Sequence, residues 1–177
     1  FMGIGLVVGA LVFFASPRRA TWEHRVSAYW ITLTNPNVEP EYQVREAQMA
    51  IYNGGATGLG AGKSTEANWL PQSTSDMVFP VIIEEYGSIF GALVVLSLYL
   101  FLFFRSVAIV TISKTFGALL ALGLSFILTL QALINMAVPV GLLPVTGQPL
   151  PLLSMGGTSV VFTCISLGII LSVSRHA

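Results

Sequence analysis

The chain has 177 residues, of which 54% are hydrophobic and only 9% charged, and its mean hydropathy is +0.80. A soluble domain of this size cannot hide so much apolar surface, so the composition predicts an integral membrane protein. The formal net charge is zero, which gives no reason to expect nucleic acid or an acidic partner. The single cysteine, Cys164, excludes a disulfide within the chain.

Residues 1–15 form an apolar run without charge, and the chain opens inside it. At a rise of about 1.5 Å per residue this run is too short to cross a hydrocarbon core of about 30 Å. We therefore expect it to be the end of a truncated transmembrane helix. Pro17 stops the run, and Arg18 and Arg19 suit the headgroup region.

Residues 16–76 are predicted to form a long polar loop with short helices and a glycine-rich segment. Trp22 and Trp30 suit the membrane interface, and a partly apolar face predicts a helix from Glu41 to Tyr52. The glycine-rich segment, Gly54 to Lys63, follows this helix. A loop of this length is uncommon unless it is functional.

The remainder is predicted to be an all-α, polytopic helical bundle. Its expected parts are a transmembrane helix at 77–104, a connector at 105–114, a second transmembrane helix at 115–138, a proline- and glycine-rich loop at 139–157 and a third transmembrane helix at 158–177.

Basic residues set the expected orientation, because short cytoplasmic loops carry an excess of Lys and Arg. Arg105, Lys114 and Arg175 all fall on one side of the predicted helices, without an accompanying acid. That side is predicted to be cytoplasmic. The loops at 16–76 and 139–157 are then both extracytoplasmic.

The glycine-rich segment invites a nucleotide-binding interpretation through Gly62, Lys63 and Ser64. A Walker A loop needs a glycine five positions before Gly62, where this chain has Thr57, so we reject that interpretation. Either the segment is a flexible connection, or its glycines let the backbone turn tightly and approach a ligand or the next helix.

Asp76 stands directly before a long apolar run. A carboxylate there could cap the helix and interact with its dipole. It could equally act as a general base toward a hydroxyl nucleophile, or hold a divalent cation such as Mg or Mn. Position alone does not decide between these roles.

Further polar residues fall within the apolar runs. Glu84 and Glu85 either face a cavity or partner, or sit in the headgroup region. Gln131 and Asn135 share one helix face, where they could line a site or join helices. His24 and His176 lack metal-ligand spacing and are assigned no role.

Two motifs carry a resemblance to a known family. The first comprises Gly54-Gly55, Gly58-Leu59-Gly60, Leu70 to Asp76 and Glu84 to Gly87; the second comprises Gln131, Asn135, Gly141 to Pro151 and Ser154 to Ser159. Together they resemble the SEDS family, the FtsW, RodA and SpoVE proteins of bacterial cell-wall synthesis. The resemblance covers nearly the whole chain.

This resemblance implies a fold of ten membrane helices, of which the chain would carry about four. It implies an inverting peptidoglycan glycosyltransferase in the bacterial inner membrane, which polymerises lipid II on the outer leaflet. A class B penicillin-binding protein and other divisome proteins are the implied partners. The essential loop aspartate of the family corresponds to Asp76, which would deprotonate the acceptor sugar hydroxyl.

Substrate contacts are expected from the two motifs. The candidates are Gly55, Gly58, Gly60, Lys63, Glu84, Glu85, Gln131, Asn135, Thr146, Gly147, Ser154, Gly156 and Gly157.

The chain departs from the family pattern at three places. Gln72 and Ser73-Thr74 stand where the family has Glu-x-His, and Met155 stands where it has tyrosine. The sequence from Gln148 to Ser159 favours a cell-division FtsW over an elongation RodA.

Two other functions compete with the enzyme. A lipid II transporter would carry ionisable groups near the bilayer midplane, whereas every acid here lies between Glu23 and Glu85. A divisome scaffold without chemistry would tolerate the loss of Asp76.

Overall fold

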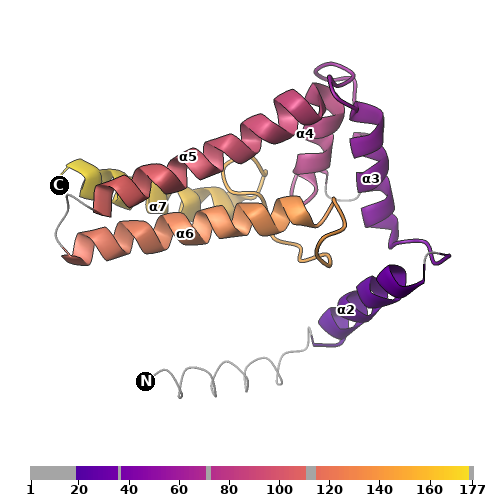
Figure 1. The fold of residues 1–177 in the computed structure, drawn as a ribbon, viewed down its shortest axis with the longest axis horizontal. Coiled ribbons are helices and arrows are strands. Elements are labelled where there is room, and N and C mark those ends of the chain that lie inside the picture. The colour runs from indigo at the N-terminus through magenta and orange to yellow at the C-terminus, as the bar shows by residue number, and fades with distance from the viewer. Residues whose placement is uncertain (1–18, 36, 71–72, 111–114, 176–177) are drawn as a thin grey trace. The chain divides into compact units, whose positions relative to one another are not determined.

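The computed structural model describes residues 19–35, 37–70, 73–110 and 115–175 (Figure 1). All regular structure in these ranges is helical, which confirms the all-α class. The chain divides into two compact units, residues 1–41 and 42–177, which are described separately. The helix end predicted for residues 1–15 lies outside the described residues.

The first unit contains α2 (Arg19–Thr34), in a stretch expected to begin the polar loop. Its bonds are local. Arg19 Nε pairs with Glu23 Oε1 one turn ahead at 2.6 Å, and Thr34 Oγ1 donates to the carbonyl of Trp30 at 2.8 Å. Such contacts between residues four apart support the helix without a buried face.

The second unit holds a bundle of α5 (Leu93–Val110), α6 (Thr115–Ala137) and α7 (Gly157–Arg175). At one end of this bundle α3 (Tyr42–Gly54) packs against α4 (Val78–Gly87), and the short helix η1 (Glu66–Asn68) lies beside α3 (Figure 1).

Small side chains let α6 approach its neighbours closely. Its buried positions recur every three or four residues: Ala118, Ala121, Ser125, Leu128, Thr129, Ala132, Asn135 and Met136. Small residues at helix contacts favour association where the surroundings are as apolar as the side chains. The face of α6 that carries Asn135 is therefore turned inward.

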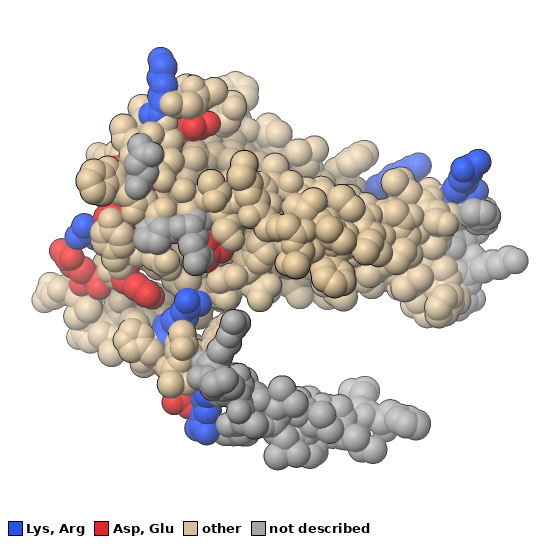
Figure 2. Space-filling view, turned by 180° about the vertical axis from the view of Figure 1, so that it is seen from behind, with Lys and Arg blue, Asp and Glu red and all other residues tan. Residues whose placement is uncertain are grey.

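Three helical stretches are long and apolar enough to cross a membrane: Val78–Ile109, Phe116–Ala137 and Gly157–Arg175. Most of their large side chains are exposed, Phe101, Phe116 and Phe162 among them. Figure 2 shows a surface without charged side chains between charged groups at one end and basic side chains at the other. Arg105 and Arg175 are the basic residues near the ends of α5 and α7.

The helix expected at 77–104 is interrupted. Gly87 has a φ of 80°, which ends α4, and a π-helical turn, η2 (Ser88–Ala92), leads into α5. Figure 1 shows α4 and α5 running at a steep angle to each other. Helix α5 also continues to Val110, so residues 105–110 are helical where a connector was expected. Residues 111–114 lie outside the described range.

The glycine-rich segment fills this interruption with its own backbone. The amides of Leu59 and Gly60 donate to the carbonyls of Glu84 and Glu85, both at 2.9 Å. In return, the carbonyl of Gly55 accepts from the amide of Ser88 at 2.9 Å. The carbonyls at the end of α4, and an amide at the start of η2, thus regain the partners that the break removes.

This contact requires glycine. A Cβ added at Gly58 would stand 2.3 Å from the carbonyl oxygen of Glu85, and one at Gly87 would stand 2.4 Å from that of Ala56. Real Cβ atoms do not approach backbone so closely. The glycine-rich segment and the end of α4 can therefore meet only because positions 58 and 87 both lack a side chain.

We expect Gly58→Ala to destabilise the protein much more than Gly62→Ala. Both glycines have positive φ, 79° and 72°, so each substitution costs about 1 kcal/mol of backbone strain. Only Gly58 adds a clash with Glu85, since nothing lies within 4 Å of a Cβ at Gly62. Thermal unfolding in detergent measures the difference, and equal losses of Tm for the two variants would contradict this packing.

Candidate functional site

The two sequence motifs meet at the turn that carries Asp76, directly before α4. The carbonyl of Thr74 accepts from the amide of Met155 at 2.8 Å, and the carbonyl of Ser75 accepts from Ser154 Oγ. The carbonyl of Asp76 accepts from Asn135 Nδ2 at 2.8 Å. Three consecutive carbonyls of the first motif are therefore bound by residues of the second.

Asn135 and Gln131 also hold the loop after α6. They lie one turn apart, and Asn135 Nδ2 donates to the carbonyl of Gln148 at 2.6 Å while Gln131 Nε2 donates to that of Pro149 at 3.0 Å. The loop has no helical bonding of its own at these residues, so side-chain amides from α6 supply the donors.

Two further side chains complete this loop. The hydroxyl of Tyr99, in α5, donates to the carbonyl of Pro151, and Ser154 Oγ accepts from the amide of Leu150 at 2.7 Å. Leu152, which lies in the chain between Pro151 and Ser154, has a φ of 69°. It is the one non-glycine residue with positive φ in the described ranges. Such strain persists only where the surrounding contacts hold it in place.

Asp76 is almost enclosed, with 7% of its surface exposed. Met77 follows it as the N-cap residue of α4 and is buried with Leu70, Ala47 and Val145. The helix thus begins after Met77 rather than at Asp76. The apolar cluster around Met77, together with the hydrogen bonds to the carbonyls of residues 74–76, fixes the position of this turn.

Glu84 lies at the other end of α4 and is fully buried. Its Oε1 accepts from the amide of Thr65 at 3.0 Å, from Thr65 Oγ1 at 2.9 Å and from the amide of Glu66 at 3.3 Å, while Oε2 accepts from Ser64 Oγ. A buried carboxylate with this many donors is well satisfied. Its place is that of an anchor for the segment Ser64–Glu66.

The structure therefore divides the predicted site residues into two groups. Asp76, Gln131, Asn135 and Ser154 lie together at the start of α4; Gly55, Gly58, Gly60, Glu84 and Glu85 lie together at its end. Helix α4 has 10 residues and is therefore about 15 Å long, so it separates the two groups.

The other candidates lie at the margins of these groups. Lys63 is exposed. Its Cδ atom lies 3.5 Å from the position that a Cβ would take at Gly60. Thr146 and Gly147 lie in the loop after α6, and Gly156 and Gly157 lie at the start of α7. Within the described ranges, no group of three or more His, Cys, Asp or Glu residues could hold a metal ion.

Sequence reasoning missed Ser64, Thr65 and Tyr99. A tyrosine within an apolar run was a usable signal for the last, because a buried hydroxyl needs a partner. Nothing in the sequence connects Ser64 and Thr65 to Glu84, since the contact spans about 20 residues of irregular chain.

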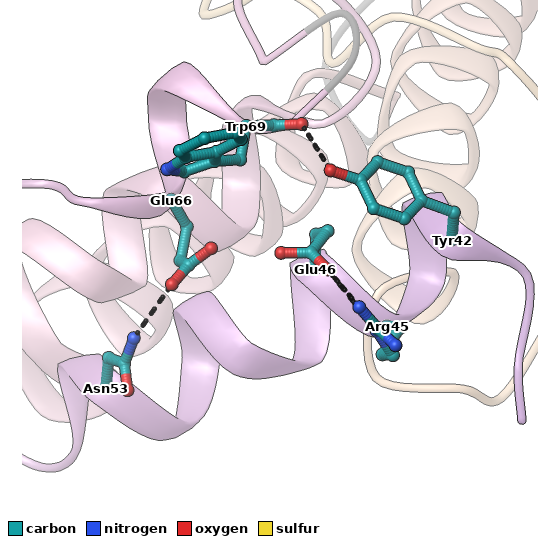
Figure 3. A network of polar contacts seen from close by, with 6 residues as sticks. All are labelled: Tyr42, Arg45, Glu46, Asn53, Glu66 and Trp69. Carbon is teal, nitrogen blue, oxygen red and sulfur yellow. Dashed lines mark hydrogen bonds and ion pairs between the residues drawn. The ribbon is translucent and has the colours of Figure 1, made fainter.

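Glu66 joins η1 to α3, and Glu46 of α3 lies nearby (Figure 3). Glu66 Oε1 accepts from Asn53 Nδ2 at 3.3 Å, and Arg45 pairs with Glu46 at 3.1 Å. Burial raises the pKa of Glu66 above its ordinary 4.5. A hydrogen bond with Glu46 and the negative charges of Glu46 and Glu84 raise this pKa further, whereas the hydrogen bond from Asn53 lowers it. The proton on Glu66 therefore favours the folded state.

Known proteins are similar to this chain in sequence and in fold. The FtsW/RodA/SpoVE family model, described as "Cell cycle protein", matches residues 1–177. Proteins named "Probable peptidoglycan glycosyltransferase FtsW" are similar: that of Geobacter sp. (strain M18) is 34% identical over 99% of this chain and 48% of its own length, and that of Legionella pneumophila is 39% identical over 99% and 45%. The chain thus spans about half the length of these relatives.

A solved structure agrees with them. It is described as "Structural coordination of polymerization and crosslinking by a peptidoglycan synthase complex". Its matching chain is 30% identical, with a TM-score of 0.66 over 97% of this chain and 48% of the other. At this identity and score the likeness extends to the fold of nearly the whole chain.

We expect Glu84→Ala to release the segment Ser64–Glu66, because it leaves two amides and two hydroxyls without their acceptor. The cost is about 3 kcal/mol or more, whereas Glu84→Gln keeps an acceptor and costs about 1 kcal/mol. Faster amide hydrogen exchange at Thr65 and Glu66 in the alanine variant alone would report the release. Equal protection in both variants would show that Glu84 is not the anchor.

We also expect Glu66→Gln to stabilise the protein at pH 7 and not at pH 4.5. Because the folded-state pKa of Glu66 is raised, its stabilising contribution is present below about 4.5 and is lost as pH rises through the folded pKa. Glutamine stays neutral and can still accept from Asn53. The difference in Tm between variant and parent, measured at both pH values, should grow with pH; a constant difference would exclude the linkage.

Proposed function

Since the chain belongs to the FtsW/RodA/SpoVE family, we propose that it forms part of a peptidoglycan glycosyltransferase that polymerises lipid II on the outer leaflet of the bacterial inner membrane. The names of its relatives support this activity. The observation that carries the proposal is the convergence of both motifs on the backbone of Thr74, Ser75 and Asp76.

Asp76 is the general base in this proposal. Its carboxylate takes the proton from the 4-hydroxyl of the acceptor sugar, and the hydroxyl oxygen forms a bond to the anomeric carbon of the donor. The bond from that carbon to undecaprenyl pyrophosphate breaks, and its electron pair leaves on the pyrophosphate. The configuration at the anomeric carbon inverts, because attack and departure occur on opposite faces.

The surroundings of Asp76 suit a substrate with a sugar head and a lipid tail. Asp76 is positioned by main-chain bonds, and a base held in place spares the reaction the cost of orienting it. Leu152, Leu153 and Met155, which flank Ser154, expose apolar side chains, Met155 to 81%. These residues offer contact to a polyprenyl chain beside a polar turn.

A divalent cation, Mg or Mn, is compatible with this site. Mg²⁺ commonly binds through one or two carboxylates together with phosphate oxygens of the substrate. Asp76 would then provide the carboxylate, as the alternative to its role as base, and the pyrophosphate the remaining ligands. Loss of polymerisation in a chelator, restored by added Mg or Mn, would support a cation at this step.

We place the loops at 16–76 and 139–157 on the outer face, because Arg105 and Arg175 lie at the opposite ends of their helices. A class B penicillin-binding protein and other divisome proteins are the proposed partners. The likeness to a chain of a peptidoglycan synthase complex supports the first of these. The sequence of the second motif favours a role in cell division over a role in elongation.

We expect Asp76→Asn and Asp76→Ala to reduce lipid II polymerisation by about 10²–10⁴-fold, the usual contribution of a general base. The assay uses the complete protein with its penicillin-binding partner. Glu23→Gln, an exposed acid of α2, is the matched control and should polymerise at the parental rate. A folded Asp76→Asn protein with normal polymerisation would refute the assignment, and lipid II flipping in liposomes lacking a polymerase would point to transport instead.

A further inference from the structure

We propose that Asn135 is a positioning residue for this glycosyl transfer: its side-chain amide joins the carbonyls of Asp76 and Gln148 and so sets where the Asp76 carboxylate stands. The inference rests on the proposed function. It replaces the sequence-based expectation that Asn135 contacts substrate or merely joins helices.

The geometry of the amide carries the argument. One nitrogen, Nδ2 of Asn135, lies 2.8 Å from the carbonyl oxygen of Asp76 and 2.6 Å from that of Gln148. An amide nitrogen has two hydrogens, so both are used, one for each carbonyl. The two carbonyls belong to segments about 70 residues apart, and a single atom therefore sets the spacing between them.

The side-chain amide of Asn135 is committed to these two bonds. Only 3% of its surface is exposed, and its Oδ1 is buried without a hydrogen-bond partner among the described residues. Burying an unpaired acceptor lowers stability, so this residue is not the best choice for packing alone. The two donated bonds to the site loops give a physical reason for an asparagine here.

Residue size restricts the alternatives. Aspartate has the shape of asparagine but no donor, and it would set a carboxylate against two carbonyl oxygens. Leucine fills the space without either bond. Both changes remove the link to Asp76 while leaving α6 helical.

Ser125 provides the comparison, since it is a buried polar residue of the same helix that lies outside the candidate site. Its hydroxyl donates to the carbonyl of Leu122 at 3.0 Å, within α6 itself. A residue that only supports the packing of α6 should behave like Ser125. A residue that positions the base should behave differently.

Ser154 holds the same turn from the other side. Its hydroxyl accepts from the amide of Leu150 and donates to the carbonyl of Ser75, so Asn135 and Ser154 bind adjacent carbonyls. If both act on the position of Asp76, removing one should make removal of the other less costly, because the turn is already displaced.

The test measures lipid II polymerisation by the complete protein with its partner. We expect Asn135→Leu to lower kcat about 10- to 100-fold with KM within about twofold, because a base misplaced by about 1 Å costs rate without changing substrate contacts. Ser125→Val should lower Tm as well, but kcat by less than about threefold. The double variant with Ser154→Ala should lose less than the product of the two single losses.

Three results would overturn the inference: kcat of Asn135→Leu within about twofold of the parent, a rise in KM that accounts for the loss, or equal kcat losses in the Asn135 and Ser125 variants. Should Asn135→Leu fail to fold, Asn135→Ser retains one donor and is judged by the same kcat and KM criteria. Activity of Asp76→Asn separates the two proposals. If that variant is active, the base assignment fails; if it is inactive while Asn135→Leu is normal, only the present inference fails.

Discussion

Carbonyl groups outside helices need donors, and within an apolar bundle only the protein can supply them. The loop after α6 meets this constraint through Tyr99, Gln131 and Asn135, whose side chains bind three of its carbonyls. Asn135 then extends the same solution to Asp76. The candidate site thus owes its geometry to the need to pair irregular backbone inside the bundle.

The interruption between α4 and α5 obeys the same constraint with a different solution. There the donors and acceptors come from the backbone of the glycine-rich segment, which lies against Glu84, Glu85 and Ser88. Glycine at 58 and 87 makes the approach possible, since a Cβ at either position would collide with carbonyl oxygen. The start of α4 is held by the side-chain amide of Asn135. Its end is held by backbone amides of the glycine-rich segment.

Asp76 and Glu84 lie at the two ends of α4, and the structure holds them differently. Glu84 is buried and bound by amides and hydroxyls of Ser64 to Glu66, so its lone pairs already serve the fold. At Asp76 the main-chain carbonyl accepts from Asn135 Nδ2, and this bond positions the residue. Because the chain belongs to the FtsW/RodA/SpoVE family, the Asp76 carboxylate is the group proposed to act as the general base.

Much of this protein follows from the sequence by itself. Long apolar runs determine the helical membrane class, because each run must satisfy its own backbone in lipid, and the motif residues single out Asp76 before any coordinates are known. The tertiary structure alone decided that α4 ends at Gly87, that Glu84 binds Ser64 and Thr65, and that Asn135 reaches Asp76. Each of these depends on contacts across about 20 to 60 residues of chain, and hydropathy records neither the direction of a side chain nor the approach of one backbone to another.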